Sequence, residues 1–207
     1  MKQINEKLLN SALISLMKDK ISVIPVGKNK IPLIPWREFQ SRLASPEEVQ
    51  KWFQMFDDPQ IGWVTGSISN LCVVDVEKGG DTSFLPQNTM IVKTGGGGYH
   101  YIFRHEEKMT NKARIRPLCD IRAEGGFIVA AGSTSDKGPY EIIKNAPLLP
   151  FPKELFPEKR DIFQYPETKP NNKQAFSQFD LDYPGYGEGQ RNDQTARFIG
   201  KVLTKVH

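Results

Sequence analysis

The sequence has 207 residues, and 28 Lys and Arg against 24 Asp and Glu give a formal net charge of +4. This length allows one domain with an appendage, and a core of that size needs no disulfide or structural metal. Apolar residues make up 38% and charged residues 25%, which excludes a wholly disordered chain, collagen and a continuous coiled coil. The mild net charge does not by itself indicate nucleic-acid binding.

No targeting segment is evident near the N-terminus. Residues 1–20 are charged throughout, and no run approaches the ~18 apolar residues that span a membrane. We therefore expect a cytoplasmic protein with no membrane partner. Cys72 and Cys119 lack the CxxC spacing and are too few for a four-thiolate zinc site, so we expect reduced cysteines and no zinc.

The first quarter of the chain predicts two helices and a strand. Apolar residues recur at helical spacing from Ile4 to Met17, and Ile21–Val26 is a β-branched run typical of a strand. Residues 45–48, Ser-Pro-Glu-Glu, predict an N-cap, a proline at the first helical position and a capping box. The helix that they start is expected to run to about Phe56.

The period then changes from helical to strand-like. Short runs of strand-forming residues alternate with Gly, Asn or Pro, and they are Ile61–Val64, Leu71–Glu77, Thr89–Lys93, Tyr99–Arg104, Phe127–Ala131 and Tyr140–Ile143. Helices followed by strands on mostly short loops predict an α+β fold with a mainly antiparallel sheet and flanking helices.

The composition changes near residue 150, where prolines become frequent. We expect a folded core at residues 1–150, a proline-rich linker or arm at 151–188 and the start of a helical region at 189–207. The last segment ends in mid-helix without a C-cap, from which we infer a piece excised from a longer protein.

Three acids are candidates for metal ligation. Asp75 and Glu77 end an apolar run and would share one face of a strand, where a divalent cation removes the cost of two close carboxylates. Asp120, in a second apolar run, would complete a two-metal site. The alternatives are solvated acids at an exposed strand end and, for Asp120, a turn aspartate.

A glycine-rich segment between two predicted strands is the next candidate. Gly95–Gly98 allow a backbone to approach a ligand closely and to turn N–H groups toward phosphates, and Lys93 enters this loop. No Gly-Lys-Ser/Thr follows, so the segment is not a Walker A loop. His100 follows two residues later. A flexible hairpin and an ordinary sheet histidine are the alternatives.

Further polar residues lie beyond the glycines. Arg122 is two residues past Asp120 on the same face, where it could contact a triphosphate, and an ion pair with Glu124 is the alternative. The Ser133 hydroxyl could reach a phosphate or close a turn. Arg104–Arg116 is a basic segment that we expect to be a loop. Its positive charges could contact the phosphates of a template strand, and the alternative is a solvated loop with no ligand.

In this order the motifs resemble the bifunctional primase-polymerase (Prim-Pol) domains of the archaeo-eukaryotic primase superfamily, including CRISPR-associated members. The resemblance covers about residues 23–143 and rests on the Asp-x-Glu strand, the glycine-rich hairpin with its histidine, and the later Asp followed by Gly-Gly and Ser. A smaller similarity is the segment 30–36, Lys-Ile-Pro-Leu-Ile-Pro-Trp. The implied fold is a Prim-Pol core with an RRM-like catalytic half.

The resemblance implies roles for these residues. Two Mg²⁺ or Mn²⁺ ions would be held by the catalytic acids Asp75, Glu77 and Asp120. The nucleotide would be bound by Lys93, Thr94, Gly95, Gly96, His100, Arg122 and Ser133. Contacts to the template or to the initiating nucleotide are expected from Arg114, Arg116, Arg191 and Asn192. Zinc-element contacts of some relatives cannot be transferred, because two cysteines form no such element.

The implied activity is template-directed nucleotidyl transfer that makes DNA primers de novo and extends them. The partners would be a single-stranded DNA template, a primer strand and dNTPs or NTPs, together with CRISPR adaptation proteins or a fused helicase or C-terminal domain. A metal-dependent nuclease is one alternative, and it leaves the glycines and His100 without a role. A catalytically inactive module that binds single strands is another.

Overall fold

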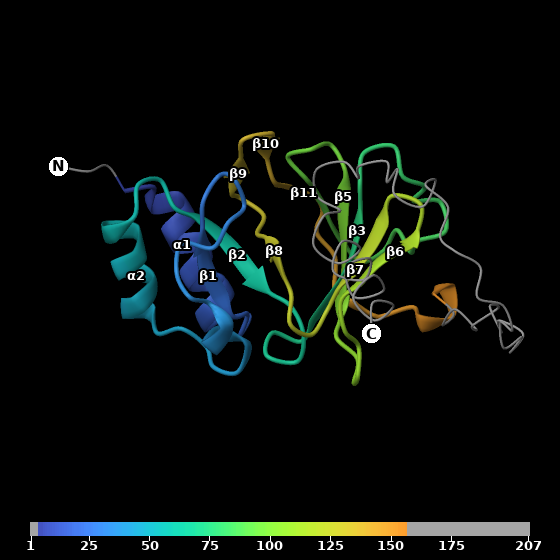
Figure 1. Ribbon diagram of the computed structural model, residues 1–207, viewed down its shortest axis with the longest axis horizontal. Helices are drawn as coiled ribbons and strands as arrows, with labels where there is room; N and C mark the ends of the chain where they lie inside the picture. The colour runs from blue at the N-terminus through green and yellow to red at the C-terminus, as the bar shows by residue number, and fades with distance from the viewer. Residues whose placement is uncertain (1–3, 157–207) are drawn as a thin grey trace, which may run out of the picture. The chain divides into compact units, whose positions relative to one another are not determined.

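The computed structural model describes residues 4–156, which form two β-sheets, a short two-stranded hairpin and two α-helices (Figure 1). The predicted α+β class with mainly antiparallel strands is confirmed. Beyond residue 156, the predicted linker and helical region lie outside the described residues. Within the described part, no helix has the length and apolar character needed to cross a bilayer.

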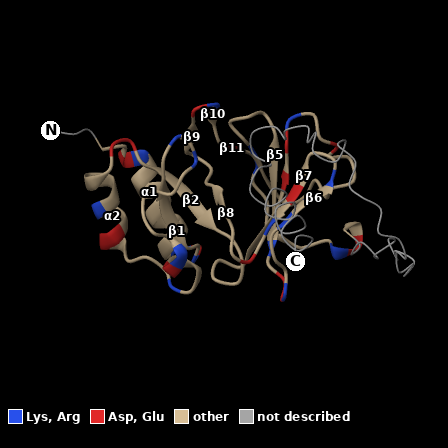
Figure 2. Cartoon of the chain, viewed as in Figure 1, with Lys and Arg blue, Asp and Glu red and all other residues tan. Residues whose placement is uncertain are grey.

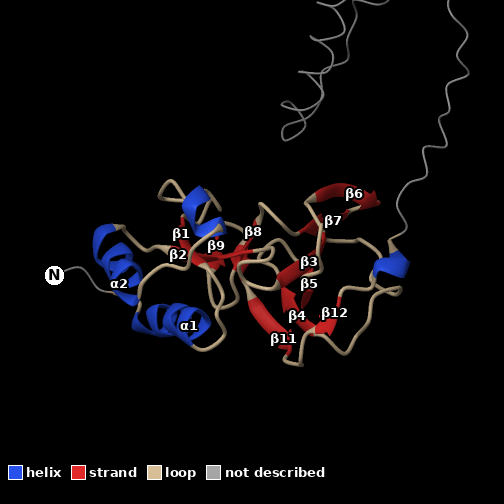
Figure 3. Ribbon diagram, turned by 90° about the horizontal axis from the view of Figure 1, so that it is seen from below, coloured by secondary structure: helices blue, strands red, loops and turns tan. Residues whose placement is uncertain are grey.

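The smaller sheet carries both α-helices. Its antiparallel strands follow the order β1 (Val23–Val26), β2 (Gln60–Val64) and β8 (Phe127–Val129). The helices α1 (Glu6–Met17) and α2 (Pro46–Met55) contact each other and β1, and they lie together beside this sheet in Figure 3. All residues of β1 and β2 are buried, and their apolar side chains share one core with the buried stripes of the helices and with the larger sheet.

The larger sheet takes up the middle of the chain. Its strands follow the spatial order β11 (Glu141–Lys144), β4 (Met90–Lys93), β5 (Tyr99–Arg104), β3 (Leu71–Val76), β7 (Cys119–Arg122) and β6 (Lys112–Arg116). These pairs are antiparallel, whereas β12 (Leu149–Pro150) adds to β5 in parallel. The chain leaves the smaller sheet after β2 and returns to it at β8, and a hairpin of β9 (Thr134–Ser135) and β10 (Gly138–Pro139) follows.

The two faces of the larger sheet bury different clusters. One face, which includes Val73 and Val92, belongs to the core shared with the smaller sheet. The other face includes Phe103, whose ring meets that of Phe151 edge-on, and Phe151 in turn stacks on Phe156. Packing of the chain therefore continues past β12 and through the short 3₁₀ helix η2 (Lys153–Leu155).

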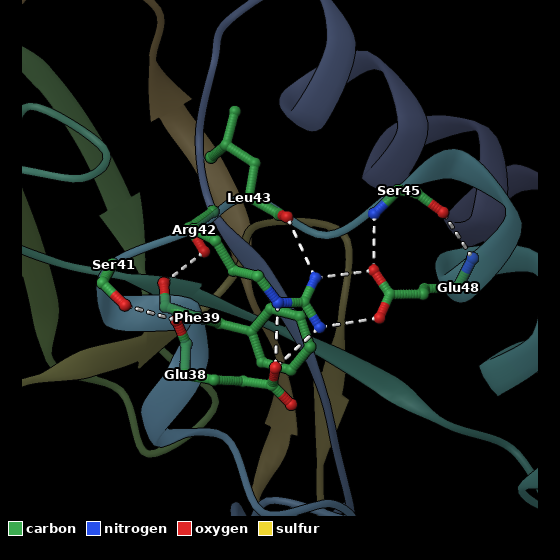
Figure 4. A network of polar contacts seen from close by, with 8 residues as sticks. Glu38, Phe39, Ser41, Arg42, Leu43, Ser45 and Glu48 are labelled. Atoms are coloured by element: carbon green, nitrogen blue, oxygen red, sulfur yellow. Dashed lines mark hydrogen bonds and ion pairs between the residues drawn. The ribbon is translucent and has the colours of Figure 1, made fainter.

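Arg42 connects the 3₁₀ helix η1 (Arg37–Gln40) to the start of α2 (Figure 4). Its guanidinium donates to both carboxylate oxygens of Glu48 and to Oε2 of Glu38, each at 2.8 Å. Glu48 Oε2 also accepts from the Ser45 N–H at 2.7 Å, and Ser45 Oγ accepts from the Glu48 N–H at 3.2 Å. The predicted capping box is thus confirmed.

Replacing Ser45 by Ala should lower the free energy of unfolding by about 1 kcal/mol, because the Glu48 N–H at the start of α2 loses its acceptor. Urea titration followed by tryptophan fluorescence would measure this change. Ser41→Ala is the matched control, since the Ser41 hydroxyl is exposed and donates to the Glu38 carbonyl outside α2. Equal losses in the two variants would contradict the role of the capping box.

The segment between residues 104 and 116 differs from the prediction. A loop was expected throughout, but this is wrong from Lys112 onward, because Lys112–Arg116 forms β6. β6 is an edge strand with four of its five residues exposed, so the alternation of Ala113 and Ile115 with three basic residues gives only a weak apolar signal. The short strands β9, β10 and β12 were also not expected from the sequence.

Candidate active site

Three polar side chains lie in one row across the centre of the larger sheet. In the pairing of β3 with β5, Asp75 is directly opposite His100, and in the pairing of β3 with β7 it is directly opposite Asp120. Residues directly opposite in antiparallel strands project from the same face. The strand register therefore brings together three residues that are far apart in the sequence.

Arg122 extends the row on the same face. Its Nη2 donates to Asp120 Oδ2 at 2.8 Å, and its Nε lies 3.7 Å from Asp75 Oδ2. Asp120 Oδ1 accepts from the Arg114 N–H at 2.8 Å. Residues of both charge signs thus adjoin around β6 and β7 (Figure 2). The guanidinium offsets the repulsion between the two carboxylates.

Asp75 lies in a mostly buried position that disfavours the ionised form of its carboxyl group. Its side chain is only 18% exposed. Burial raises the pKa of Asp75 above its usual value, the charge of Asp120 acts in the same direction, and the charges of Arg122 and Lys30 act against them. A buried acid that opposes folding in this way is typical of functional sites.

His100 is buried beside Asp75, with its Nε2 at 3.5 Å from Asp75 Oδ1. Its Nδ1 is buried without a hydrogen-bond partner in the described part of the chain. Burial, together with the charges of Lys30 and Arg122, lowers the pKa of His100 to about 3, and the charge of Glu77 opposes this. The imidazole is therefore neutral at physiological pH.

The neutral state of His100 predicts a pH-dependent stability. The unfolded chain takes up a proton on this imidazole below pH ~6.5, whereas the folded chain does not, so stability falls as the pH falls. Between pH 7 and pH 5 the protein should lose about 2 kcal/mol more than a His100→Gln variant. Urea titrations across this range measure the difference. An imidazole that titrates near pH 6.5 in the folded protein by NMR would contradict it.

Glu77 follows the last residue of β3, and its N–H donates to the Leu118 carbonyl at 2.8 Å. Among residues 4–156, no three His, Cys, Asp or Glu side chains are gathered to hold a metal ion as they lie. Asp75 and Asp120 nevertheless offer the carboxylate oxygens that Mg²⁺ and Mn²⁺ prefer, and Arg122 shows that positive charge is stabilised between them. These two carboxylates are oxygen donors of the kind that a divalent cation takes, and Glu77 is the next acid along the chain, directly after β3.

The glycine-rich segment forms a tight turn between β4 and β5. The Thr94 N–H donates to the Gly98 carbonyl, and the Thr94 carbonyl accepts from the Gly97 N–H, both at 2.9 Å. Thr94 Oγ1 also accepts from the Gly98 N–H at 3.1 Å. The amides of Gly97 and Gly98 therefore bind Thr94, and the role of Thr94 in this structure is to close the turn.

Two of these glycines are required by close backbone packing. A Cβ on Gly98 would lie 2.2 Å from the Val76 carbonyl oxygen, and a Cβ on Gly95 would lie 2.2 Å from that of Gly138. Gly96 differs, since the nearest atom to its Cβ would be a lysine side-chain carbon at 3.8 Å. Gly97 likewise has no close neighbour, but its φ of +84° favours glycine, so Gly96 is the glycine of this loop that neither packing nor backbone conformation explains.

Lys93 belongs to the opposite face of the sheet from the acids. It pairs with Tyr99, which pairs with Val76, and Val76 pairs with Cys119. On this face Cys72 and Cys119 are buried free thiols, and burial raises their pKa values to about 12 and about 11. The alternation along β4 therefore separates Lys93 from the row of Asp75.

Ser133 lies beside the smaller sheet. It is buried, and its Oγ accepts from the Ile61 N–H at 3.1 Å and donates to the Ile61 carbonyl at 3.2 Å. Both contacts fix the segment after β8 against β2. The structure thus assigns this hydroxyl a contact within the fold.

The residues expected at the template are divided. Arg114 approaches the acids through its backbone N–H. Arg116 lies over the ring of Phe84 at 4.1 Å and donates to the Leu155 carbonyl at 3.1 Å, so it packs against the other cluster. Arg191 and Asn192 lie outside the described residues.

Two residues with no assigned role in the sequence border the row. The ring of Tyr140 lies 5.7 Å from that of His100, and Lys30 Nζ lies 6.0 Å from the centre of the Tyr140 ring. Lys30 follows β1 of the smaller sheet. The basic turn that contains it is visible in the sequence, but its approach to β3 and β5 depends on how the two sheets pack.

Comparison with known proteins gives one family. The family model described as "Bifunctional DNA primase/polymerase, N-terminal" (Prim-Pol) matches residues 13–154, which is more than half of the chain. No curated protein matches the chain. The matched range contains every element from β1 to β12, and with them Asp75, His100, Asp120 and Arg122.

Proposed function

Because the chain belongs to the bifunctional DNA primase/polymerase family, we propose that it is a template-directed nucleotidyltransferase that synthesises DNA primers de novo and extends them on single-stranded templates. The substrates would be dNTPs or NTPs. The finer features of this proposal are the de novo start, the metal ions and the individual roles of the site residues.

The observation that supports the proposal most is the row of His100, Asp75 and Asp120 on the three central strands. Two acids directly opposite one another repel, and burial adds to the cost. Neither cost is explained by packing, since apolar residues at these positions would stabilise the sheet. Such a local conflict in an otherwise consistent core is expected at a functional site.

Each side chain has a proposed task. When bound by Asp75, Glu77 and Asp120, two Mg²⁺ or Mn²⁺ ions would lower the pKa of the primer 3′-hydroxyl and neutralise charge on the leaving pyrophosphate. His100, which is neutral and has an unpaired Nδ1, can donate one N–H to a phosphate oxygen without adding charge. Arg122 keeps the two aspartates in position and is the cation nearest to them.

The test is an incubation of the protein with a single-stranded DNA template and nucleotides, without primer, in Mg²⁺ and in Mn²⁺ separately. Labelled products that form without primer and only when the template is present support primase activity. Products that form only when a primer is added support a polymerase alone. Shortening of labelled DNA in the absence of nucleotides would instead indicate the nuclease, and binding without any product would indicate an inactive module.

Two features expected from the sequence remain predictions. They are an RRM-like description of the catalytic half and association with CRISPR adaptation proteins or a fused helicase. The family match favours neither the nuclease nor the inactive module.

A further inference from the structure

Lys30 sits in a fixed turn rather than in a free loop. The Lys30 N–H donates to the Gly27 carbonyl and the Gly27 N–H donates to the Ile31 carbonyl, both at 2.8 Å. The carbonyl of Lys28 accepts from the Asp136 N–H at 3.1 Å, which ties the turn to the hairpin of β9 and β10. The backbone that carries the Lys30 side chain is therefore held from two directions.

The conformation of Lys30 is one that glycine or asparagine adopts more easily. Its φ is +67°, in the left-handed region, which costs a lysine free energy. The Lys30 ammonium group lies 6.0 Å from the centre of the Tyr140 ring, and that ring lies 5.7 Å from the ring of His100. Its charge also lowers the pKa of Asp75 and of His100, so its ammonium group acts on the face that carries the acids.

The charges on this face leave Lys30 available for an anion. Arg122 already contacts the carboxylates of Asp75 and Asp120. Lys28, two residues before Lys30, forms an ion pair with Asp58 at 2.6 Å. For Lys30, by contrast, no ion pair is found within residues 4–156, and its ammonium group lies over the Tyr140 ring.

We propose that Lys30 binds the phosphate groups of the nucleotide on this face, so that the nucleotide site is shared between the smaller and the larger sheet. This inference rests on the proposed function, because it takes a nucleoside triphosphate as the ligand. The ammonium group supplies positive charge that Arg122 cannot supply while it holds the two aspartates. A phosphate oxygen is the compact, strongly charged acceptor that a lysine head group pairs with.

The test compares Lys30→Asn with Lys28→Asn in the full chain. Asn tolerates the left-handed conformation, so Lys30→Asn removes the charge and keeps the turn. Primer extension with Mn²⁺ should show the KM for dNTPs raised about tenfold in Lys30→Asn, which corresponds to about 1.4 kcal/mol, with kcat changed much less. Lys28→Asn, with the same loss of charge in the same turn, should keep the wild-type KM.

Direct binding gives the second readout. Equilibrium binding of a dNTP should weaken in Lys30→Asn, whereas binding of the phosphate-free deoxynucleoside should not. Lys30→Arg should retain most of the dNTP affinity. An unchanged KM in Lys30→Asn, an equal effect of Lys28→Asn, or a parallel loss of deoxynucleoside binding would overturn the proposal.

The proposed function can fail separately from the role of Lys30. A wild-type protein that binds dNTPs through Lys30 but incorporates none would overturn the polymerase activity and support the phosphate contact. If the wild type incorporates dNTPs and Lys30→Asn has the same KM, the polymerase activity is supported and the phosphate contact of Lys30 is overturned.

Discussion

Asp75→Asn should slow nucleotide incorporation by a factor on the order of 10²–10³ without unfolding the protein. The substitution keeps the size and shape of the side chain and removes its charge between His100 and Asp120. Asn would be a weaker ligand for the proposed metal ions, whose positive charge would stabilise the transition state, and losing one such preorganised electrostatic contribution lowers kcat by a factor on the order of 10²–10³. Single-turnover primer extension on a labelled template measures the change.

The same substitution should leave stability unchanged or raised at neutral pH. The folded-state pKa of Asp75 lies above its usual value, so ionisation costs stability as the pH rises from about 4 through the folded pKa. Above that range the cost is fully present in the wild type and absent in Asp75→Asn. Thermal unfolding at pH 4 and pH 7 would show whether the advantage of the variant grows with pH.

Glu107→Gln provides the control for charge alone, because Glu107 is an exposed acid in the segment after β5. It should retain wild-type incorporation. Full activity of Asp75→Asn would remove Asp75 from the mechanism, and a large loss of stability in Asp75→Asn would leave its activity loss attributable to unfolding.

Gly98→Ala is the second substitution for which we expect a large effect. Its Cβ would lie 2.2 Å from the Val76 carbonyl and 3.1 Å from backbone atoms of Glu77, and neither neighbour is a flexible side chain. The strands β3 and β5 must therefore separate beside the acids. We expect the free energy of unfolding to fall by about 3 kcal/mol, at the upper end of overpacking effects. Urea denaturation measures it.

Gly96→Ala is the matched control in the same turn. Its Cβ would meet no atom closer than 3.8 Å, and its φ lies outside the left-handed region. Its stability should stay within about 0.5 kcal/mol of the wild type, since no close contact is created. If Gly96→Ala were as destabilising as Gly98→Ala, the turn would need glycine for flexibility rather than for close approach.

The local features of the fold follow well from the sequence. Ser45 and Glu48 predict the start of α2, because a capping box is made by two residues only three positions apart. Asp120 and Arg122 share a face because side chains alternate along any strand. These inferences need no knowledge of which strands are neighbours.

The non-local features do not follow. Nothing in the sequence states that β7 pairs with β3, and hence that Asp120 meets Asp75. Lys93 adjoins the glycines in sequence, but the alternation of β4 turns it to the other face. Lys30 is missed for a related reason, because it reaches the site through the packing of a turn from the smaller sheet.

The row of His100, Asp75 and Asp120 depends on two strand registers being correct at once. A shift of β7 by one residue would place Cys119 or Ile121 opposite Asp75 in place of Asp120. The Asp120 side chain would then point into the apolar cluster on the other face of the sheet. Evolution can therefore lengthen or shorten the connections of this sheet, such as the segment between β3 and β4, far more freely than β7. Insertion or deletion of a single residue within that strand would change the chemistry of the whole face.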